Sequence, residues 1–334
     1  MRAILLIILA VGFTSLSYGQ QITDYSNFIL NKEYYNPAIV GSRTVHMASV
    51  NYRKQWAGFD DAPSVFIGNF SGSVKNKGKI GYGISAISEK TGLTQNTSVY
   101  LNYAQHFKLS EKLKLGLGIK PGYMQYRVKL YAAVLADEGD QVLTGNVYTA
   151  NALDVSAGFN LYSDKFFFMA SAQRLLGKTI TFTSYNSSLA FHYNAIVGYN
   201  FLIKKKNIEI QPSLLVKYAA PAAMQYTGMI KTTFNSKFWF GLLYKGDFEY
   251  RDNLFPVNSA GASLGITLKE RFMIGYGYDY TLSKISSYQS GSHEIMLSFV
   301  ISKKKPTLEE EDDKLNNSIL EQRKKELEEK EKNK

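Results

Sequence analysis

Four histidines are the residues of this 334-residue chain best suited to bind a metal ion or to move a proton. His46, His106, His192 and His293 fall in different predicted strands, far from one another in the sequence. Metal sites draw on histidine, cysteine and carboxylate ligands at short, recurrent spacings, and these four show none. We therefore predict no metal and no cofactor, and we interpret the histidines as side chains that face a protein interior or an interface.

Nucleophilic catalysis is the second chemistry to consider. A hydrolase brings a serine, a histidine and a carboxylate together, and Ser290 and Ser292 lie beside His293. Their spacing specifies no reaction, and the sequence has no G-x-S-x-G or H-E-x-x-H motif. Residues 116–122 are rich in glycine but alternate as a strand. The sequence has no cysteine, which excludes thiolate catalysis and disulfides. We expect a protein that is not an enzyme.

The elements that carry these residues read as β-strands with two different faces. In residues 272–280, large apolar or aromatic residues alternate with Met273, Gly275, Gly277 and Asp279. Residues 113–120 and 261–268 repeat the pattern. Successive side chains of a strand point to opposite faces, and a second face of glycine, serine and an occasional lysine suits a narrow, filled lumen. A face in water would carry more glutamate, lysine and threonine.

The connections between the strands favour a transmembrane β-barrel over a soluble β-sandwich, which also alternates. Connections after even-numbered strands are short and basic, as in 204–207, whereas most others are longer, as in 128–151, 175–187 and 248–258; 219–223 is a short exception. Outer-membrane barrels have short periplasmic turns, long extracellular loops and an even strand count. The 24 tyrosines and 20 phenylalanines suit the two lipid–water interfaces.

We therefore predict an all-β fold, an antiparallel up-and-down transmembrane barrel of about fourteen strands. The predicted strands cover residues 43–53, 63–74, 79–88, 97–107, 112–127, 152–162, 166–174, 188–202, 207–218, 224–234, 237–247, 259–268, 271–281 and 292–302.

The N-terminal residues predict export. Residues 1–19 combine a positive start at Arg2, an apolar core over 4–11 and a small-x-small cleavage site at 17–19, as in a secretory signal peptide. The apolar run is shorter than the ~20 residues of a spanning helix. We assign 20–42 to a lead-in segment, 43–302 to the barrel and 303–334 to a charged tail. We expect the barrel to lie in the outer membrane, and an even strand count places both termini in the periplasm.

The charged residues argue for a membrane protein with protein partners. The net charge of +11 is spread over the turns, which does not indicate a nucleic-acid surface. In the tail, Thr307 and Glu310 match a capping box, and Glu321 and Lys325 are spaced to support a helix. Two interpretations of the tail stay open: a solvated, partly frayed or disordered segment, or a helix that docks to a periplasmic partner.

Three segments carry more than a generic barrel pattern. Residues 35–42 read YNPAIVGS, residues 52–63 read YRKQWAGFDDAP, and residues 291–299 read GSHEIMLSF. In combination they resemble the PorP/SprF family, outer-membrane components of the type IX secretion system of Bacteroidetes. The resemblance covers the mature barrel, with strong motifs at its two ends. The long charged tail departs from a minimal member of the family.

The resemblance implies a non-enzymatic role in type IX protein secretion, and in gliding motility where that occurs. Implied partners are other secretion components and a secreted or surface cargo protein such as an adhesin. The alternative function is a pore for small solutes, because fourteen strands can enclose a channel. The resemblance singles out nine residues as barrel-signature or partner-contact positions: Asn36, Pro37, Gly41, Arg53, Gln55, Trp56, Gly58, Phe59 and Pro63.

Physical reasoning assigns structural tasks to the first of these residues. Pro37 biases Asn36 away from helix, so we expect the pair to form the turn that starts the barrel. Gly41 would allow a close approach of two backbones. Either these residues build the first hairpin of the barrel, or they contact cargo or another partner directly.

The later signature residues extend this interpretation. Arg53 shares a strand face with small polar residues, so we expect it to face the lumen and to pair with Asp279 or Glu294. Trp56 and Phe59 fit an outer aromatic girdle, with Asp60 and Asp61 in the adjacent loop.

Overall fold

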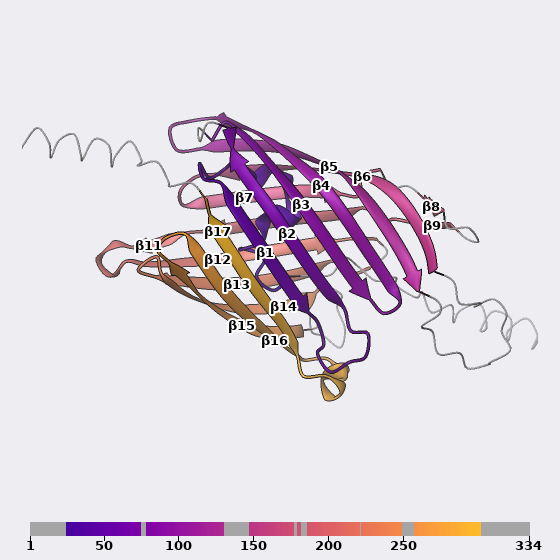
Figure 1. Ribbon diagram of the computed structural model, residues 1–334. Helices are drawn as coiled ribbons and strands as arrows, with labels where there is room; N and C mark the ends of the chain where they lie inside the picture. The colour runs from indigo at the N-terminus through magenta and orange to yellow at the C-terminus, as the bar shows by residue number, and fades with distance from the viewer. Residues whose placement is uncertain are drawn as a thin grey trace, which may run out of the picture.

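The computed structural model describes residues 25–74, 78–129, 147–176, 179–181, 186–220, 222–248 and 257–301. These residues form an antiparallel sheet that closes into a barrel (Figure 1). β1 (Met47–Lys54) pairs with β17 (Ser292–Val300), and β10 (His192–Tyr199) pairs with β12 (Ile208–Tyr218). β11 (Phe201–Ile203) continues β10 beyond Asn200, so the fifteen segments of the sheet make fourteen barrel strands.

The other strands follow one another around the barrel in chain order. They are β2 (Ser64–Ser73), β3 (Ile80–Thr91), β4 (Thr94–Lys108), β5 (Lys114–Lys129), β6 (Val147–Tyr162), β7 (Phe166–Gln173), β13 (Gln225–Phe234), β14 (Phe238–Asp247), β15 (Val257–Leu268) and β16 (Phe272–Thr281). A small separate hairpin, β8 (Thr179–Thr181) and β9 (Asn186–Ser188), lies between β7 and β10. The described short helices are α2 (Lys32–Tyr35), η1 (Pro37–Ile39), η5 (Lys204–Lys206) and η6 (Lys284–Tyr288).

The fourteen-strand antiparallel barrel predicted from alternation is confirmed. In β16, Ile274 and Tyr276 are exposed on the outer face, whereas Gly275, Gly277 and Asp279 face inward and are buried. Lipid cannot accept or donate hydrogen bonds, so a sheet without edges is the arrangement of strands that satisfies every backbone group in a bilayer. No helix in the described part of the chain is long and apolar enough to cross a membrane.

The two ends of the barrel differ in their connections, largely as predicted. Short turns join β4 to β5, β13 to β14 and β15 to β16 at one end, here called the short-turn end. At the other, the long-loop end, the connections are longer, but β3 and β4 join through Gly92 and Leu93 alone. We expected the first of these strands to end at residue 88 and the second to begin at residue 97, whereas β3 runs to Thr91 and β4 begins at Thr94. β1 begins at Met47 rather than at residue 43, and β6 begins at Val147 rather than at residue 152.

Residues 25–42 lie inside the barrel and are called the plug here. Tyr25 and Phe28 have no exposed surface, and Tyr35 is 2% exposed. Ser26 contacts the strands close to the long-loop end, and Val40 lies against Gly81 close to the short-turn end. The plug therefore runs along most of the lumen before β1 begins. The predicted signal peptide (1–19) and tail (303–334) lie outside the described residues, as do 20–24 of the lead-in segment.

Inward-facing glycines make room for the plug backbone. A Cβ atom built on Gly118 would lie 2.4 Å from the backbone nitrogen of Ala38, and one built on Gly81 would lie 1.9 Å from the carbonyl oxygen of Val40. Gly158 is similarly close to the Asn36 side chain. These glycines explain why one face of the alternating strands is so poor in side-chain volume.

The lumen also holds an apolar core, which the sequence analysis did not anticipate. Large apolar residues turn inward and pack against the plug, whereas we expected only small or polar side chains on this face. The buried wall residues of this core are Val65, Ile67, Ile87, Tyr100, Met124, Phe167, Met169, Ile196, Leu215, Met229 and Leu243, and the plug contributes Tyr25, Phe28, Ile29, Tyr34 and Tyr35. Burying a side chain such as Phe28 contributes ~2 kcal/mol, so the core holds the plug in place.

Replacing a lumen glycine should loosen the plug. Gly118→Val places side-chain atoms where the backbone at Ala38 now lies, and overpacking of this kind costs about 1–3 kcal/mol. Urea unfolding of the purified barrel should show this loss. Gly228→Val is the matched control, because a Cβ atom on Gly228 meets nothing within 4 Å. Equal stability of the two variants would contradict the close fit of plug and wall.

Candidate functional site

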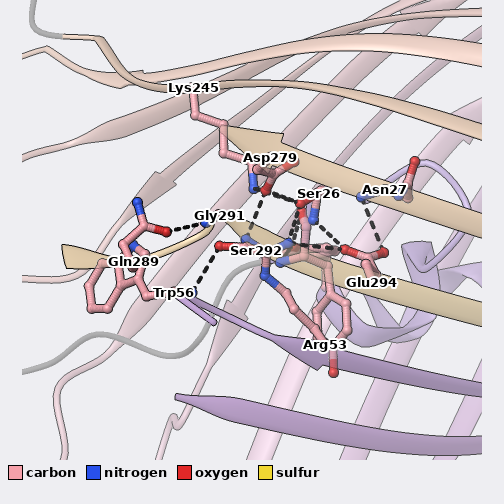
Figure 2. A network of polar contacts seen from close by, with 12 residues as sticks. Ser26, Asn27, Arg53, Trp56, Lys245, Asp279, Gln289, Gly291, Ser292 and Glu294 are labelled. Atoms are coloured by element: carbon pink, nitrogen blue, oxygen red, sulfur yellow. Dashed lines mark hydrogen bonds and ion pairs between the residues drawn. The ribbon is translucent and has the colours of Figure 1, made fainter. Parts of the chain in front are cut away.

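A buried ion network lies where the plug meets the last strands of the barrel (Figure 2). The Arg53 guanidinium lies 2.8 Å from Asp279 Oδ2 and 3.5 Å from Glu294 Oε2, and the Lys245 ammonium lies 3.1 Å from Asp279 Oδ2. All four side chains are at most 10% exposed. The predicted pairing of a lumen-facing Arg53 with Asp279 or Glu294 is confirmed, and it engages both carboxylates.

The same network binds the start of the plug. The backbone N–H groups of Ser26 and Asn27 donate to Glu294, at 2.8 and 3.3 Å. The Ser26 hydroxyl donates to Asp279 Oδ2 and accepts from Arg53 and, at 3.1 Å, from Lys245. Buried charges are stable only when they are paired and hydrogen-bonded. Ser26 and Asn27 are therefore part of what makes this network possible, and sequence reasoning missed them along with Lys245.

Asn36 connects the middle of the plug to two strands. Its side-chain oxygen accepts from Ala38 N (2.8 Å) and caps η1, while its amide nitrogen donates to the carbonyls of Phe159 (2.9 Å) and Ala170 (3.0 Å). Asn36 has an extended backbone, as expected before proline, and Pro37 is the first residue of η1. The pair does not form the turn that starts the barrel, because it lies inside the lumen well before β1.

Gly41 lies at the point where the plug leaves the lumen. Its φ of 75° is in the left-handed region that favours glycine. A Cβ atom on Gly41 would lie 2.3 Å from the Cα atom of Gly81. The predicted close approach of two backbones at Gly41 is thereby confirmed.

Polar side chains of the wall satisfy the backbone of the plug. Because a buried carbonyl needs a hydrogen-bond donor, the plug can occupy the lumen only where the wall offers donors. Wall donors to plug carbonyls are Gln173 to Tyr34 (2.8 Å) and Tyr35 (3.0 Å), Ser171 to Tyr35 (2.6 Å), Lys120 to Tyr34 (3.3 Å) and His106 Nε2 to Val40 (2.8 Å). The polar lumen face is thus a lining matched to a polypeptide.

The first loop, residues 55–63, is hydrogen-bonded to the last loop, residues 282–291, and to the start of β17, beside the pairing of β1 with β17. The backbone N–H groups of Trp56 and Ala57 donate to Ser292 Oγ (3.2 Å) and to the Gly291 carbonyl (2.7 Å), and Ser290 N donates back to the Ala57 carbonyl (2.7 Å). Within the loop, Gln55 N donates to the Pro63 carbonyl (2.8 Å). The backbone at the start of this loop is therefore held in place by hydrogen bonds.

The tip of the first loop combines strained backbone with exposed side chains. Trp56 and Gly58 have φ values of 50° and 93°, in the left-handed region. Phe59 is 46% exposed, and Trp56 is partly exposed. The Asp61 carboxylate accepts from the Lys90 ammonium at 2.9 Å, and this hydrogen bond lowers the pKa of Asp61 from its ordinary value. The loop thus presents an aromatic side chain on a fixed backbone.

The histidines have structural partners. His106 bridges Val40 of the plug and the Tyr162 hydroxyl, which lies 3.0 Å from Nδ1. His293 Nδ1 lies 2.7 Å from the Tyr276 hydroxyl, and the nearby Ser290 hydroxyl donates to the Ala57 carbonyl. Neither interaction is a serine–histidine pair. Among the described residues, no three histidine, cysteine or carboxylate side chains gather as a metal site would require.

Comparison with known proteins identifies the family. The family model described as "Type IX secretion system membrane protein PorP/SprF" matches residues 17–299, which include the plug and all of the barrel strands except the last residue of β17. The chain belongs to the PorP/SprF family. The resemblance inferred from residues 35–42, 52–63 and 291–299 is thereby confirmed, and the protein is a β-barrel of the outer-membrane kind from this secretion system. No curated protein matches the chain.

Solved structures similar to this PorP/SprF barrel share little sequence with it. The toluene transporter TbuX of Ralstonia pickettii is 11% identical, with a TM-score of 0.47, over 79% of this chain and 91% of that chain. The monoaromatic hydrocarbon channel CymD is 8% identical (TM-score 0.47; 85% and 94%), and Omp33 of Acinetobacter baumannii is 8% identical (TM-score 0.42; 78% and 100%). Function must be argued from the lumen and loops of this barrel itself.

Removing Arg53 should destabilise the PorP/SprF barrel strongly. Arg53→Ala leaves two buried carboxylates with Lys245 as their remaining cation, and breaking a buried pair costs about 3–5 kcal/mol. Urea unfolding followed by fluorescence of Trp56 and Trp239 measures this loss. Arg53→Lys should recover part of it, because lysine keeps the charge without the planar fork of donors.

The control for this experiment is an exposed ion pair. Lys90→Ala removes the partner of Asp61, and surface pairs contribute little to stability, so the unfolding midpoint should stay almost unchanged. If Arg53→Ala and Lys90→Ala unfold at the same urea concentration, the buried network does not hold the structure together.

Proposed function

We propose that this PorP/SprF barrel is a non-enzymatic scaffold of the type IX secretion system, which supports export or surface anchoring of cargo proteins by binding partners. One observation carries the proposal: the plug fills the lumen from Ser26 to Val40 and hydrogen-bonds to the wall along its length. A barrel that is packed in this way offers its ends and loops to other proteins. The alternative, a pore for small solutes, requires that the plug leave.

The proposal divides the signature residues by task. Asn36, Pro37, Gly41 and Arg53 hold the plug. Gln55, Trp56, Gly58, Phe59 and Pro63 shape the first loop, whose exposed Phe59 is a natural contact for cargo or for another secretion component. Aromatic side chains on a fixed backbone lose little conformational entropy on binding. The charged residues 303–334 would add a contact for a periplasmic partner.

The proposed orientation places the short-turn end in the periplasm. Bacterial outer-membrane barrels turn their short connections to the periplasm and their long loops outward. β1 begins and β17 ends at the short-turn end, so both ends of the barrel proper lie in the periplasm. The first loop and the ion network then lie toward the cell surface.

Single cysteines test this orientation cleanly, because the native sequence has none. Asp60→Cys lies in the exposed first loop, and Lys205→Cys lies in the exposed turn η5 at the opposite end. On intact cells, a membrane-impermeant maleimide should label Asp60→Cys and leave Lys205→Cys unmodified, and both should react once the outer membrane is permeabilised. Labelling of Lys205→Cys alone on intact cells would invert the orientation.

Deletion of the gene tests the scaffold function. Cells without the protein should fail to export or retain one or a few large surface proteins, while uptake of small solutes stays normal. The purified full-length barrel should show almost no conductance in planar bilayers, because its lumen is filled. Complementation with the full chain should restore the surface proteins, and complementation with a chain ending at Ser302 asks whether the tail takes part.

The opposite pattern would overturn the scaffold proposal. Normal delivery of surface proteins together with reduced solute uptake, or steady single-channel conductance of the full-length barrel, would favour the pore. Failure of the Ser302-terminated chain to restore delivery, despite normal insertion, would assign partner binding to the tail.

A further inference from the structure

A small polar cavity lies beside the plug at the long-loop end of the lumen. The volume open to the centre of a water-sized sphere is about 30 Å³, which is enough for one or two water molecules or for a functional group of similar size. Its charged and amide lining comes from five strands and from the residue after β7, and the Tyr34 ring of α2 lies on one side. The charged and amide residues are Glu89, Asn96, Lys120, Asp154, Gln173 and Arg174. The cavity is separate from the ion network at Arg53.

The two carboxylates of the cavity already have neutral hydrogen-bond donors. Glu89 accepts from the Tyr34 hydroxyl at 3.1 Å and from the Asn96 amide at 3.1 Å. Asp154 accepts from the Tyr100 hydroxyl at 3.1 Å. A cation entering the cavity would therefore compete with contacts that are in place, so the acids do not define what the cavity binds.

The two cations of the cavity, Lys120 and Arg174, use few of their hydrogen-bond donors. The Lys120 side chain is buried, and its ammonium carries three donors. Among the described residues it makes one hydrogen bond, to the Tyr34 carbonyl at 3.3 Å, and it lies 4.8 Å from the centroid of the Tyr100 ring. Arg174 makes no hydrogen bond or ion pair to any other residue that the structure describes. A guanidinium has five donors arranged to match a carboxylate. Among the described residues, Lys120 and Arg174 therefore have more donors than acceptors, and an acceptor oxygen in the cavity would use them.

Arg174 also occupies an unusual backbone conformation. Its φ of 61° lies in the left-handed region, where a residue with a Cβ atom is strained. Strain of this kind is typical of positions where a side chain must point in a required direction. Here that direction is into the cavity. Arg174 and Glu89 are partly exposed, so a ligand can reach the cavity from the long-loop end.

We propose that this cavity binds a carboxylate group of a peptide, held by Arg174 and Lys120. The cavity has room for a carboxylate. Asn96 Oδ1 is buried and accepts no hydrogen bond from the described residues, so it offers an acceptor for an N–H group next to the bound carboxylate. The carboxylate can be the C-terminus of a peptide or the side chain of an acidic residue, and these two sources are separable by experiment.

Three short peptides test the proposal on the purified full-length barrel by isothermal titration calorimetry. Acetyl-tetraglycine carries a C-terminal carboxylate, its amide carries none, and acetyl-Gly-Glu-Gly-amide carries a side-chain carboxylate. At least one carboxylate peptide should bind at least tenfold more tightly than the amide, and which one does identifies the source. Equal binding of all three, or no binding by any, would overturn the proposal.

Variants of Arg174 complete the test. Arg174→Gln should remove the preference for the carboxylate peptide. Arg174→Gly should do the same without loss of stability, because glycine relieves the left-handed strain. Arg127→Gln, at an exposed arginine near the end of β5, is the matched control and should bind as the native barrel does. Unchanged preference in both Arg174 variants would show that the carboxylate binds elsewhere.

Discussion

A strand that crosses a bilayer can hydrogen-bond only to other strands, and this constraint determines the rest of the structure. The sheet closes through β1 with β17 and through β10 with β12, so no edge is left. Closure creates an interior, which residues 25–42 fill in this barrel. A polypeptide inside a barrel brings its own backbone polar groups, and each needs a partner. The wall supplies Gln173, Ser171, His106 and Glu294 for that purpose.

The strands could be predicted from the sequence, whereas the position of the plug inside the barrel could not. Alternation is a local signal with a period of two residues, so fourteen strands and the inward direction of Arg53 could be predicted from short windows. The inward direction of Arg53 led in turn to a predicted partner, Asp279 or Glu294, and the structure pairs Arg53 with both. The sequence of the plug has no regular alternation of apolar and polar residues. Its contacts with the wall join residues far apart in the sequence, and Ser26 and Glu294 are separated by 268 positions. No local pattern encodes such a contact.

One signal for the filled lumen was nevertheless present. Residues 166–169 (FFFM) and 214–216 (LLV) break the alternation, and strands that are buried on both faces read as continuous apolar runs. Phe167, Met169 and Leu215 are the inward members of these runs, and they form part of the core around the plug. Lys245, an isolated cation on the inward face of β14, was a comparable sign of a buried partner.

The ion network that binds Ser26 also bears on the order in which the protein is made. Its carboxylates, Asp279 and Glu294, belong to β16 and β17, the final strands of the barrel to leave the ribosome and the translocon. The segment that they secure is among the first to emerge. A polypeptide that stops short of the final hairpin therefore lacks the two carboxylates that bind Ser26 and Asn27. The ion network can form only after the last two strands have been made.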